Sequence, residues 1–279
     1  MPLSAELSVA REAALDAASL IRARSAGFDR RDARTKTTHD LVTDVDEAAQ
    51  RVILERLRGA FPDDAILAEE GGRDGARPLA SGRRWIVDPL DGTTNFAHGV
   101  PPYAVSIALE DAGEIVVGVV AEVTSGETFC ATRGGGLTVD GTPASVSHTA
   151  ILDEALIATG FPFRDYSYAR GYLETFEAMI HITRGLRRHG SAAMDLAWTA
   201  AGRFDGFFEA GLAPWDVAAG VLLVREGGGT VTGIDGASHP VFSGGLVAAP
   251  PALHPAIVDA CRPLAGAYAS RSETTGGRG

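Results

Sequence analysis

The run from Trp85 to Phe96 constrains the fold more than any other part of the chain. It begins with the apolar residues Trp85-Ile86-Val87, which favour a buried strand. Two carboxylates follow, Asp88 and Asp91, and then Gly92-Thr93-Thr94, which indicates a turn into a helix. The run therefore predicts a strand, a turn and a helix in succession, with two acidic residues at the junction.

This junction carries groups suited to a divalent cation and to a phosphate. Carboxylates at the end of a strand can hold hard cations, and backbone N–H groups at the start of a helix can hold a phosphate. Gly92 allows the backbone to approach an anion closely. A metal beside a phosphate indicates metal-assisted phosphoryl chemistry. A D-x-x-D turn alone occurs in many loops, so the interpretation depends on further acidic residues.

Three further acidic residues support a metal site. Glu69 ends the preceding strand, Asp46 begins the second helix, and Asp216 begins a helix at Pro214–Gly220. Each also has a purely structural explanation, because acidic residues are common in the first turn of a helix and at solvated strand ends. Carboxylates gathered in one pocket repel each other unless cations neutralise them. A set of oxygen ligands favours Mg²⁺ over zinc.

Hydrophobic periodicity predicts the helices and strands of most of the chain. We expect helices near residues 4–25, 45–61, 169–183, 192–201, 215–226 and 252–261, and strands near residues 65–68, 103–109, 115–123, 127–132, 157, 204–209, 230 and 246. We expect a polar connection at 36–43, an exposed loop at 71–83 and a disordered tail at 266–279. Hairpins mixed with helices favour layered sheets and helices, in one domain over residues 1–265 with halves of about 1–145 and 146–265.

Composition argues against several functional classes. A formal net charge of −11 over 279 residues disfavours nonspecific binding to nucleic acid or to anionic membranes. We expect no signal peptide at the N-terminus and no membrane span. The two cysteines, Cys130 and Cys261, lie far apart and form no metal-binding motif, which suits a reducing compartment. These features predict a cytoplasmic enzyme.

The same residues carry a resemblance to the inositol monophosphatase family. Its two hallmark motifs are similar to the segments 85–96 and 214–220. Further segments of the family match in the same order: Asp40-Leu41-Val42-Thr43 with Asp46, Glu69-Glu70, His189–Ala193 and Phe207–Glu209. The resemblance covers about residues 5–262. It implies an α/β fold of five layers, an αβαβα sandwich, usually a homodimer, and Mg²⁺-dependent hydrolysis of small phosphate monoesters that is sensitive to lithium.

The resemblance also implies a role for each matching residue. Glu69, Asp88 and the carbonyl of Leu90 would bind a first Mg²⁺, Asp88, Asp91 and Asp216 a second, and Glu69 a weaker third. Thr93, paired with Asp46, would activate the attacking water, so that Glu69, Thr93 and Asp46 form the catalytic set. The substrate contacts would be Asp91, Gly92, Thr93, Thr94, Gly190, Ala192 and Glu209. Lys36 corresponds to a basic residue of a mobile loop, although that loop is one residue shorter here.

Several alternatives remain open. Phosphatases of the haloacid dehalogenase type need D-x-D, whereas the spacing here is D-x-x-D. The ending Asp91–Phe96 and Glu209 favour myo-inositol 1-phosphate as substrate, with histidinol phosphate and fructose 1,6-bisphosphate as alternatives. A different class is a protein without catalysis, or a regulatory protein that contacts the transcription machinery. Three arginines that could serve such a contact are interpreted as a solvated face or a dimer contact: Arg184, Arg187 and Arg188.

Overall fold

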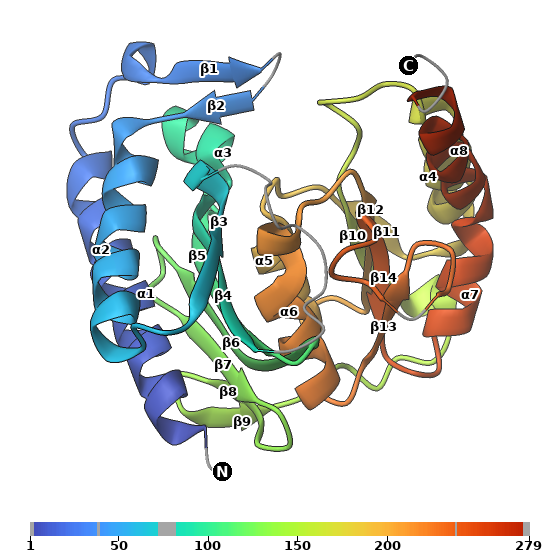
Figure 1. Ribbon diagram of the computed structural model, residues 1–279. Coiled ribbons are helices and arrows are strands. Elements are labelled where there is room, and N and C mark those ends of the chain that lie inside the picture. Colours follow the sequence, from blue (N-terminus) through green and yellow to red (C-terminus); the bar gives the residue numbers. More distant parts are fainter. Residues whose placement is uncertain (1–2, 38–39, 72–81, 238, 276–279) are drawn as a thin grey trace.

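A computed structural model describes residues 3–37, 40–71, 82–237 and 239–275. In these residues, helices and sheets form five layers (Figure 1). From one side to the other, the layers are a helix pair, a seven-stranded sheet, a second helix pair, a five-stranded sheet and a group of three helices. The expectation of an αβαβα sandwich is therefore confirmed.

The first half of the chain forms the first helix pair and the larger sheet. The helices are α1 (Ser4–Ser25) and α2 (Asp44–Ala60), and the hairpin of β1 (Arg34–Thr37) and β2 (Asp40–Val42) lies between them in the sequence. The strands, in their order across the sheet, are β3 (Ala65–Ala68), β4 (Arg83–Asp91), β5 (Ala104–Asp111), β6 (Glu114–Glu122), β7 (Thr128–Thr132), β8 (Gly136–Val139) and β9 (Thr142–Ala144). Strands β3 and β4 are parallel, whereas β4 to β9 pair antiparallel, as the predicted hairpins require. The short helix α3 (Thr93–His98) follows β4.

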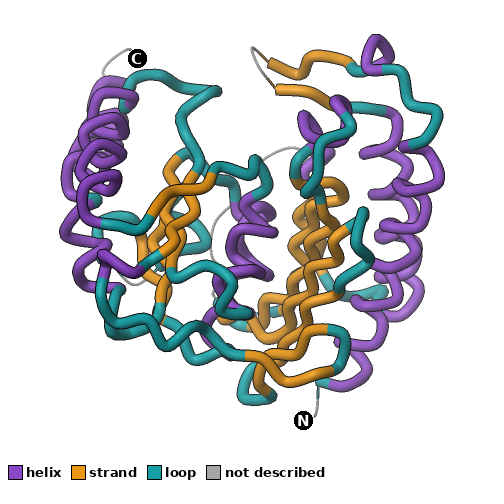
Figure 2. The backbone as a smooth tube through the Cα atoms, turned by 180° about the vertical axis from the view of Figure 1, so that it is seen from behind, coloured by secondary structure: helices purple, strands orange, loops and turns teal. Residues whose placement is uncertain are grey.

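The second half forms the smaller sheet and the remaining helices, and Figure 2 shows the same layers from behind. Its strands, in their order across the sheet, are β11 (Gly185–Arg187), β10 (Leu156–Thr159), β12 (Gly206–Ala210), β14 (Gly245–Ala249) and β13 (Thr230–Gly233). Helices α5 (Ala192–Ala200) and α6 (Pro214–Glu226) lie between the two sheets. The outer helices are α4 (Ala169–Ile182), α7 (His254–Ala260) and α8 (Arg262–Thr275).

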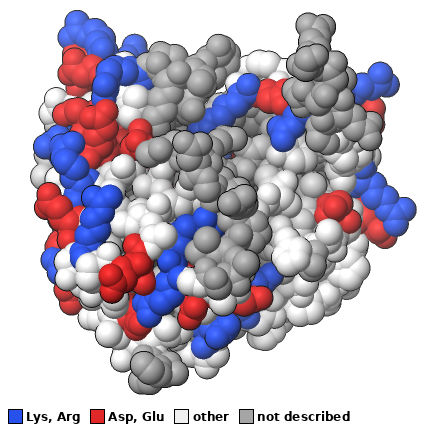
Figure 3. All heavy atoms as spheres, viewed as in Figure 1, with Lys and Arg blue, Asp and Glu red and all other residues white. Residues whose placement is uncertain are grey.

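The burial of each helix follows from its place among the layers. Helix α6 is buried from Pro214 to Val224, which suits a helix covered on both sides by a sheet. Helix α1 buries only a stripe of alanines and one isoleucine, and its other face carries charges. Arg56 of α2 pairs with Glu12 and Asp16 of α1 on that outer surface. Figure 3 shows charged side chains of both signs mixed over this side of the molecule.

Strand β4 contains an irregularity that decides which face its carboxylates occupy. Asp88 lies opposite Ser106 of β5 and Asp91 lies opposite Ala104, so three steps along β4 match two steps along β5. In a regular strand, residues three apart point to opposite faces. The extra residue of the bulge brings the two carboxylates to the same face. The strand thus continues through Asp91, where the sequence predicted a turn.

Other expectations need correction. Residues 266–275 are helical as part of α8, not a disordered tail. The helix has tertiary contacts that its composition does not reveal, since Leu264 is fully buried and Tyr268 packs on Tyr168. The expected polar connection at 36–43 contains part of the β1–β2 hairpin. Most of the expected loop at 71–83 lies outside the described residues. No helix in the described residues combines the length and hydropathy needed to cross a membrane.

Candidate active site

A cavity of about 550 Å³ lies where the two halves meet, and it takes side chains from both. The residues assigned to metal or substrate from the sequence all line it: Glu69, Asp88, Leu90, Asp91, Gly92, Thr93, Thr94, Gly190, Ala192, Glu209 and Asp216. Asp46 lies behind this lining and contacts the cavity through Thr93. The structure therefore brings together residues that are widely separated in the sequence.

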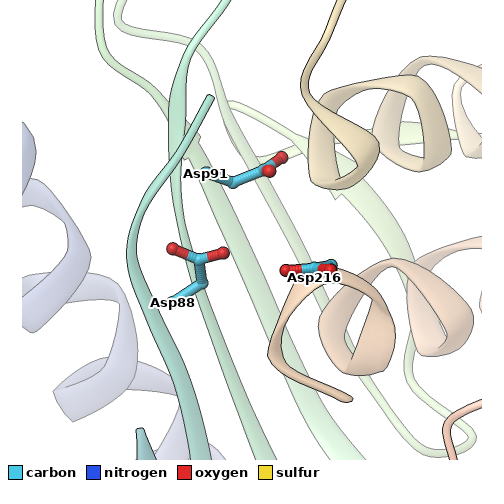
Figure 4. A group of neighbouring side chains, drawn as sticks. All are labelled: Asp88, Asp91 and Asp216. Carbon is cyan, nitrogen blue, oxygen red and sulfur yellow. The ribbon is translucent and has the colours of Figure 1, made fainter. Parts of the chain in front are cut away.

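Three carboxylates converge in this cavity. Asp88 and Asp91 come from β4, and Asp216 comes from the first turn of α6. One oxygen of each lies within 4.8 Å of the others, and Figure 4 shows the three side chains turned toward a common space. Oxygen donors at such spacing match the preference of Mg²⁺. Glu69, directly after β3, lines the same cavity outside this group of three.

Hydrogen bonds hold each of these carboxylates in place. Asp91 Oδ2 accepts from Ser191 Oγ at 2.6 Å and from Ala193 N at 2.8 Å. Asp88 Oδ1 accepts from the backbone N–H of Leu90 at 3.0 Å. Asp216 Oδ2 accepts from Ala213 N at 2.7 Å, which caps the N-terminus of α6. The orientation of all three is thus fixed by the fold itself.

The electrostatics of the group favour a bound cation. Burial, together with the neighbouring Asp216, raises the pKa of Asp91 to about 8. Burial, followed by the charges of Glu69 and Asp91, raises the pKa of Asp88 well above its usual value. Buried like charges are costly unless they are protonated or neutralised by an opposite charge. The residues present therefore fit a divalent metal.

Thr93 and Asp46 form a hydrogen-bonded pair beside this group. Thr93 Oγ1 lies 2.9 Å from Asp46 Oδ1 and 3.0 Å from the carbonyl oxygen of Leu90. Asp46 Oδ2 accepts from the backbone N–H of Thr43 at 2.8 Å and from the Thr43 hydroxyl, which caps α2. Burial raises the pKa of Asp46. The pair can accept a proton from a group bound in the cavity.

Glycine is required where the two halves approach each other. Gly92 has φ +91°, and a Cβ there would lie 3.2 Å from the carbonyl oxygen of Pro102 and 3.4 Å from that of Gly190. Asn95 of α3 crosses the same junction. Its Nδ2 donates to the carbonyl oxygens of Pro102 at 2.8 Å and of His189 at 2.6 Å. The start of α3 is thereby fixed against the loop before α5.

Glu209, on β12, and Arg188, directly after β11, line the cavity from the second half of the chain. Burial and the charge of Asp195 raise the pKa of Glu209 well above its usual value, and Arg188 opposes this rise. The Arg188 guanidinium lies 4.3 Å from the ring centroid of Phe161. Arg188 lines the cavity and remains exposed, so it faces solvent, as expected, and also the site.

Sequence reasoning missed several residues of the site. Ser191 and Asn95 make hydrogen bonds that no local pattern predicts, since their partners lie about a hundred residues away. The loop between β10 and α4 contributes Phe161, Arg164 and Tyr166 to the lining. The aromatic residues between the predicted strand near residue 157 and the predicted helix at 169–183 were the available signal, because exposed apolar patches often mark binding surfaces. The side chain of Lys36 lies outside the described residues.

Comparisons with known proteins agree with this geometry. Residues 3–264 match the inositol monophosphatase family. A protein of Pseudomonas aeruginosa named Nus factor SuhB is 43% identical over 244 residues, which cover 87% of this chain and 90% of that protein. A protein of Rhizobium meliloti named inositol-1-monophosphatase is 45% identical over 212 residues, covering 75% of this chain and 77% of that protein.

Solved structures show the same fold. The extragenic suppressor protein SuhB from Bartonella henselae superposes with a TM-score of 0.85 at 36% identity, covering 92% of this chain and 98% of that chain. The inositol monophosphatase from Anabaena superposes with a TM-score of 0.80 at 38% identity, covering 92% of this chain and 95% of that chain.

Proposed function

This chain belongs to the inositol monophosphatase family, and we propose that it hydrolyses myo-inositol 1-phosphate to myo-inositol and phosphate with the aid of Mg²⁺. The observation that carries the proposal is the convergence of the Asp88, Asp91 and Asp216 oxygens beside the start of α3. The Rhizobium relative, named inositol-1-monophosphatase, supports the substrate. Histidinol phosphate and fructose 1,6-bisphosphate are the alternative substrates.

The acidic residues of the cavity would hold two or three Mg²⁺ ions. The assigned ligands are Glu69, Asp88, Asp91, Asp216 and the carbonyl oxygen of Leu90. When bound, Mg²⁺ supplies Lewis-acid chemistry, because it neutralises negative charge on phosphate and on the departing alkoxide and lowers the pKa of water. Ser191 and Ala193 hold Asp91 ready for this role through their hydrogen bonds.

Thr93 and Asp46 would orient the attacking water and take its proton. When Thr93 donates its single hydroxyl proton to Asp46 Oδ1, the lone pairs of Oγ1 can accept a hydrogen bond from water. The raised pKa of Asp46 makes it a stronger base than an exposed aspartate. As the water attacks phosphorus, its proton passes to Thr93 Oγ1 while the Thr93 proton passes to Asp46.

One wall of the cavity would bind the phosphate of the substrate, and the opposite wall would bind its ring. Backbone N–H groups of Gly92 and Thr93, at the start of α3, face the phosphate, together with Thr94 and Asp91. Glu209, Gly190 and Ala192 face the ring hydroxyls from the other half. A substrate with a polyol ring satisfies both walls, whereas inorganic phosphate satisfies only the first.

The test is phosphate release from the three candidate esters, each with Mg²⁺, with EDTA, and with the variant Asp91→Asn. Asp259→Asn is the matched control, because it makes the same chemical change in a solvent-exposed ion pair on α7. We expect Mg²⁺-dependent turnover that prefers the inositol ester, is lost in Asp91→Asn and is retained in Asp259→Asn. Absence of turnover of every ester by folded protein contradicts the proposal.

A regulatory role is the second candidate function. It is favoured by the relative from Pseudomonas aeruginosa, which carries the name Nus factor. In this role the chain would contact the transcription machinery. Recovery of RNA polymerase subunits with the purified chain, by wild type and Asp91→Asn alike, would support it independently of catalysis.

The remaining family properties belong to the same proposal. We expect a homodimer located in the cytoplasm and inhibited by lithium, without binding to membranes or nucleic acid. Light scattering of the purified chain tests the dimer, and a lithium titration of Mg²⁺-dependent turnover tests the inhibition.

A further inference from the structure

We propose that the C-terminal part of α8 braces residues 160–168, here named the cavity loop, and so sets how tightly the cavity holds the leaving group of its substrate. The brace consists of two positioning residues, Tyr268 and Arg271. Its kinetic consequence rests on the proposed phosphatase function, whereas the brace itself does not.

Most residues of the cavity loop line the cavity. It connects β10 to α4, and it has neither strand nor helical structure before Ala169. Phe161 and Tyr166 line the cavity although 46% and 60% of their surfaces remain exposed. A loop with so little burial of its own depends on contacts with neighbouring elements for a defined conformation.

Helix α8 supplies such contacts from a single turn. Arg271 Nη1 lies 3.2 Å from Asp165 Oδ2. The ring of Tyr268 packs edge-on against that of Tyr168, with centroids 5.1 Å apart. The Arg271 guanidinium also lies 4.1 Å from the Tyr268 centroid, so it joins both contacts. Figures 1 and 2 both show the loop reaching the C-terminal end of α8.

Tyr168 transmits this support to the ring-binding wall. Its hydroxyl donates to the carbonyl oxygen of Ala210 at 3.1 Å, directly after Glu209. Only glycine at position 211 allows the Tyr168 side chain to take this position, because residue 211 has φ +91° and a Cβ there would lie 2.3 Å from the Tyr168 hydroxyl oxygen. A displaced Tyr168 would therefore loosen the end of β12 that presents Glu209 to the cavity.

The match to the family model ends at residue 264, before Tyr268 and Arg271. Leu264 is fully buried and anchors the start of the helix. The Arg271–Asp165 pair is about one-third exposed on each side, and exposed ion pairs contribute little to global stability. Its loss should therefore act on the loop more than on the fold.

The test compares Arg271→Ala with Arg262→Ala. Arg262 is the matched control, because it lies on the same helix and forms an exposed pair with Asp259. Hydrogen exchange of the amides in the cavity loop is measured without substrate, and KM and kcat are measured with the ester that wild type prefers. We expect Arg271→Ala to speed loop exchange and to raise KM about two- to five-fold, the range of an exposed pair, with kcat unchanged within about twofold.

Two further variants sharpen the result. Asp165→Asn should reproduce part of the effect of Arg271→Ala, because it removes the ion pair but keeps the contact of Arg271 with the Tyr268 ring. The double variant should add little to Arg271→Ala alone, because Arg271→Ala already removes the ion pair. The combination of Tyr268→Ala with Arg271→Ala should raise KM further, to about tenfold, since it also removes the ring contact.

The outcomes separate the brace from the proposed function. If Arg271→Ala changes loop exchange no more than Arg262→Ala does, the brace is wrong, whether or not the protein is active. If exchange rises but KM stays at the wild-type value, the kinetic part is wrong. If wild type hydrolyses no ester, the proposed function fails while loop exchange still decides the brace.

Discussion

Asp46 and Asp216 each serve the fold with one carboxylate oxygen. Asp46 Oδ2 accepts from Thr43 and caps α2, while its Oδ1 lies 2.9 Å from the Thr93 hydroxyl. Asp216 Oδ2 caps α6 through Ala213, and the side chain also belongs to the group of three carboxylates. In the sequence, an acidic residue in the first turn of a helix can be interpreted either as a helix cap or as a functional group. The structure shows that one carboxylate can serve as both.

At the residue scale, Thr93→Val should stop the proton transfer without removing the metal site. The substitution keeps the branched shape and deletes the hydroxyl that bonds Asp46. We expect kcat to fall about 10²- to 10⁴-fold, the usual contribution of a positioned acid or base, with little change in the Mg²⁺ activation constant. Steady-state kinetics over a Mg²⁺ series measure both. Thr93→Ser, which retains the hydroxyl, should keep most of the activity, and a large loss there would contradict the role.

Among the elements, β4 and α3 determine the site. The apolar run before Asp88 was enough to predict the strand, because a hydrophobic pattern can be recognised within a few neighbouring residues. The bulge between Asp88 and Asp91 was not predictable, because it depends on the pairing of β4 with β5. The helical end of α8 was missed for the same reason, as its contacts with Tyr168 come from a distant segment. Local signals thus predicted the elements, and distant partners decided their details.

At the element scale, Asn95→Ala should loosen α3 from the loop before α5. The change leaves the carbonyl oxygens of Pro102 and His189 without the Asn95 donor. We expect the free energy of unfolding to fall by about 1–3 kcal/mol, the cost of such loss in a partly buried site. Denaturant unfolding measures this. KM for the inositol ester should rise as well, because Gly190 is no longer held beside Gly92.

A control separates these two effects of Asn95. Turnover of a small phosphate ester without a ring depends on the metal and phosphate wall alone, so its KM should change less than that of the inositol ester. An equal rise in KM for both esters would contradict the view that Asn95 aligns the ring-binding loop.

The carboxylates of Asp88, Asp91 and Asp216 repel one another where the two halves of the molecule meet. The pKa of Asp91 is raised to about 8 in the folded chain, from an ordinary value of 3.8. Between these values the folded state keeps a proton that the unfolded state has released. The free energy of unfolding of metal-free protein therefore falls as pH rises through this window. Bound Mg²⁺ removes the cost by neutralising the carboxylates.

At the scale of the whole molecule, EDTA-treated protein should melt at a lower temperature at pH 8.5 than at pH 6. Added Mg²⁺ should raise the melting temperature more at pH 8.5, where binding no longer has to displace protons. Differential scanning fluorimetry over a pH series measures both. Asp91→Asn should flatten the pH dependence of the metal-free protein, and an unchanged slope in that variant would assign the effect to other groups.

The span of chain between the ligands also fixes when activity can first arise during synthesis. Ala193, which holds Asp91, lies 102 residues after it, and Asp216 follows later still. A ribosome-bound chain that has completed the larger sheet thus carries the assigned ligands Glu69, Asp88, Leu90 and Asp91 but still lacks Asp216. The complete set of ligands forms only when the two halves meet, so the first half must be stabilised by its own core until α6 has been synthesised.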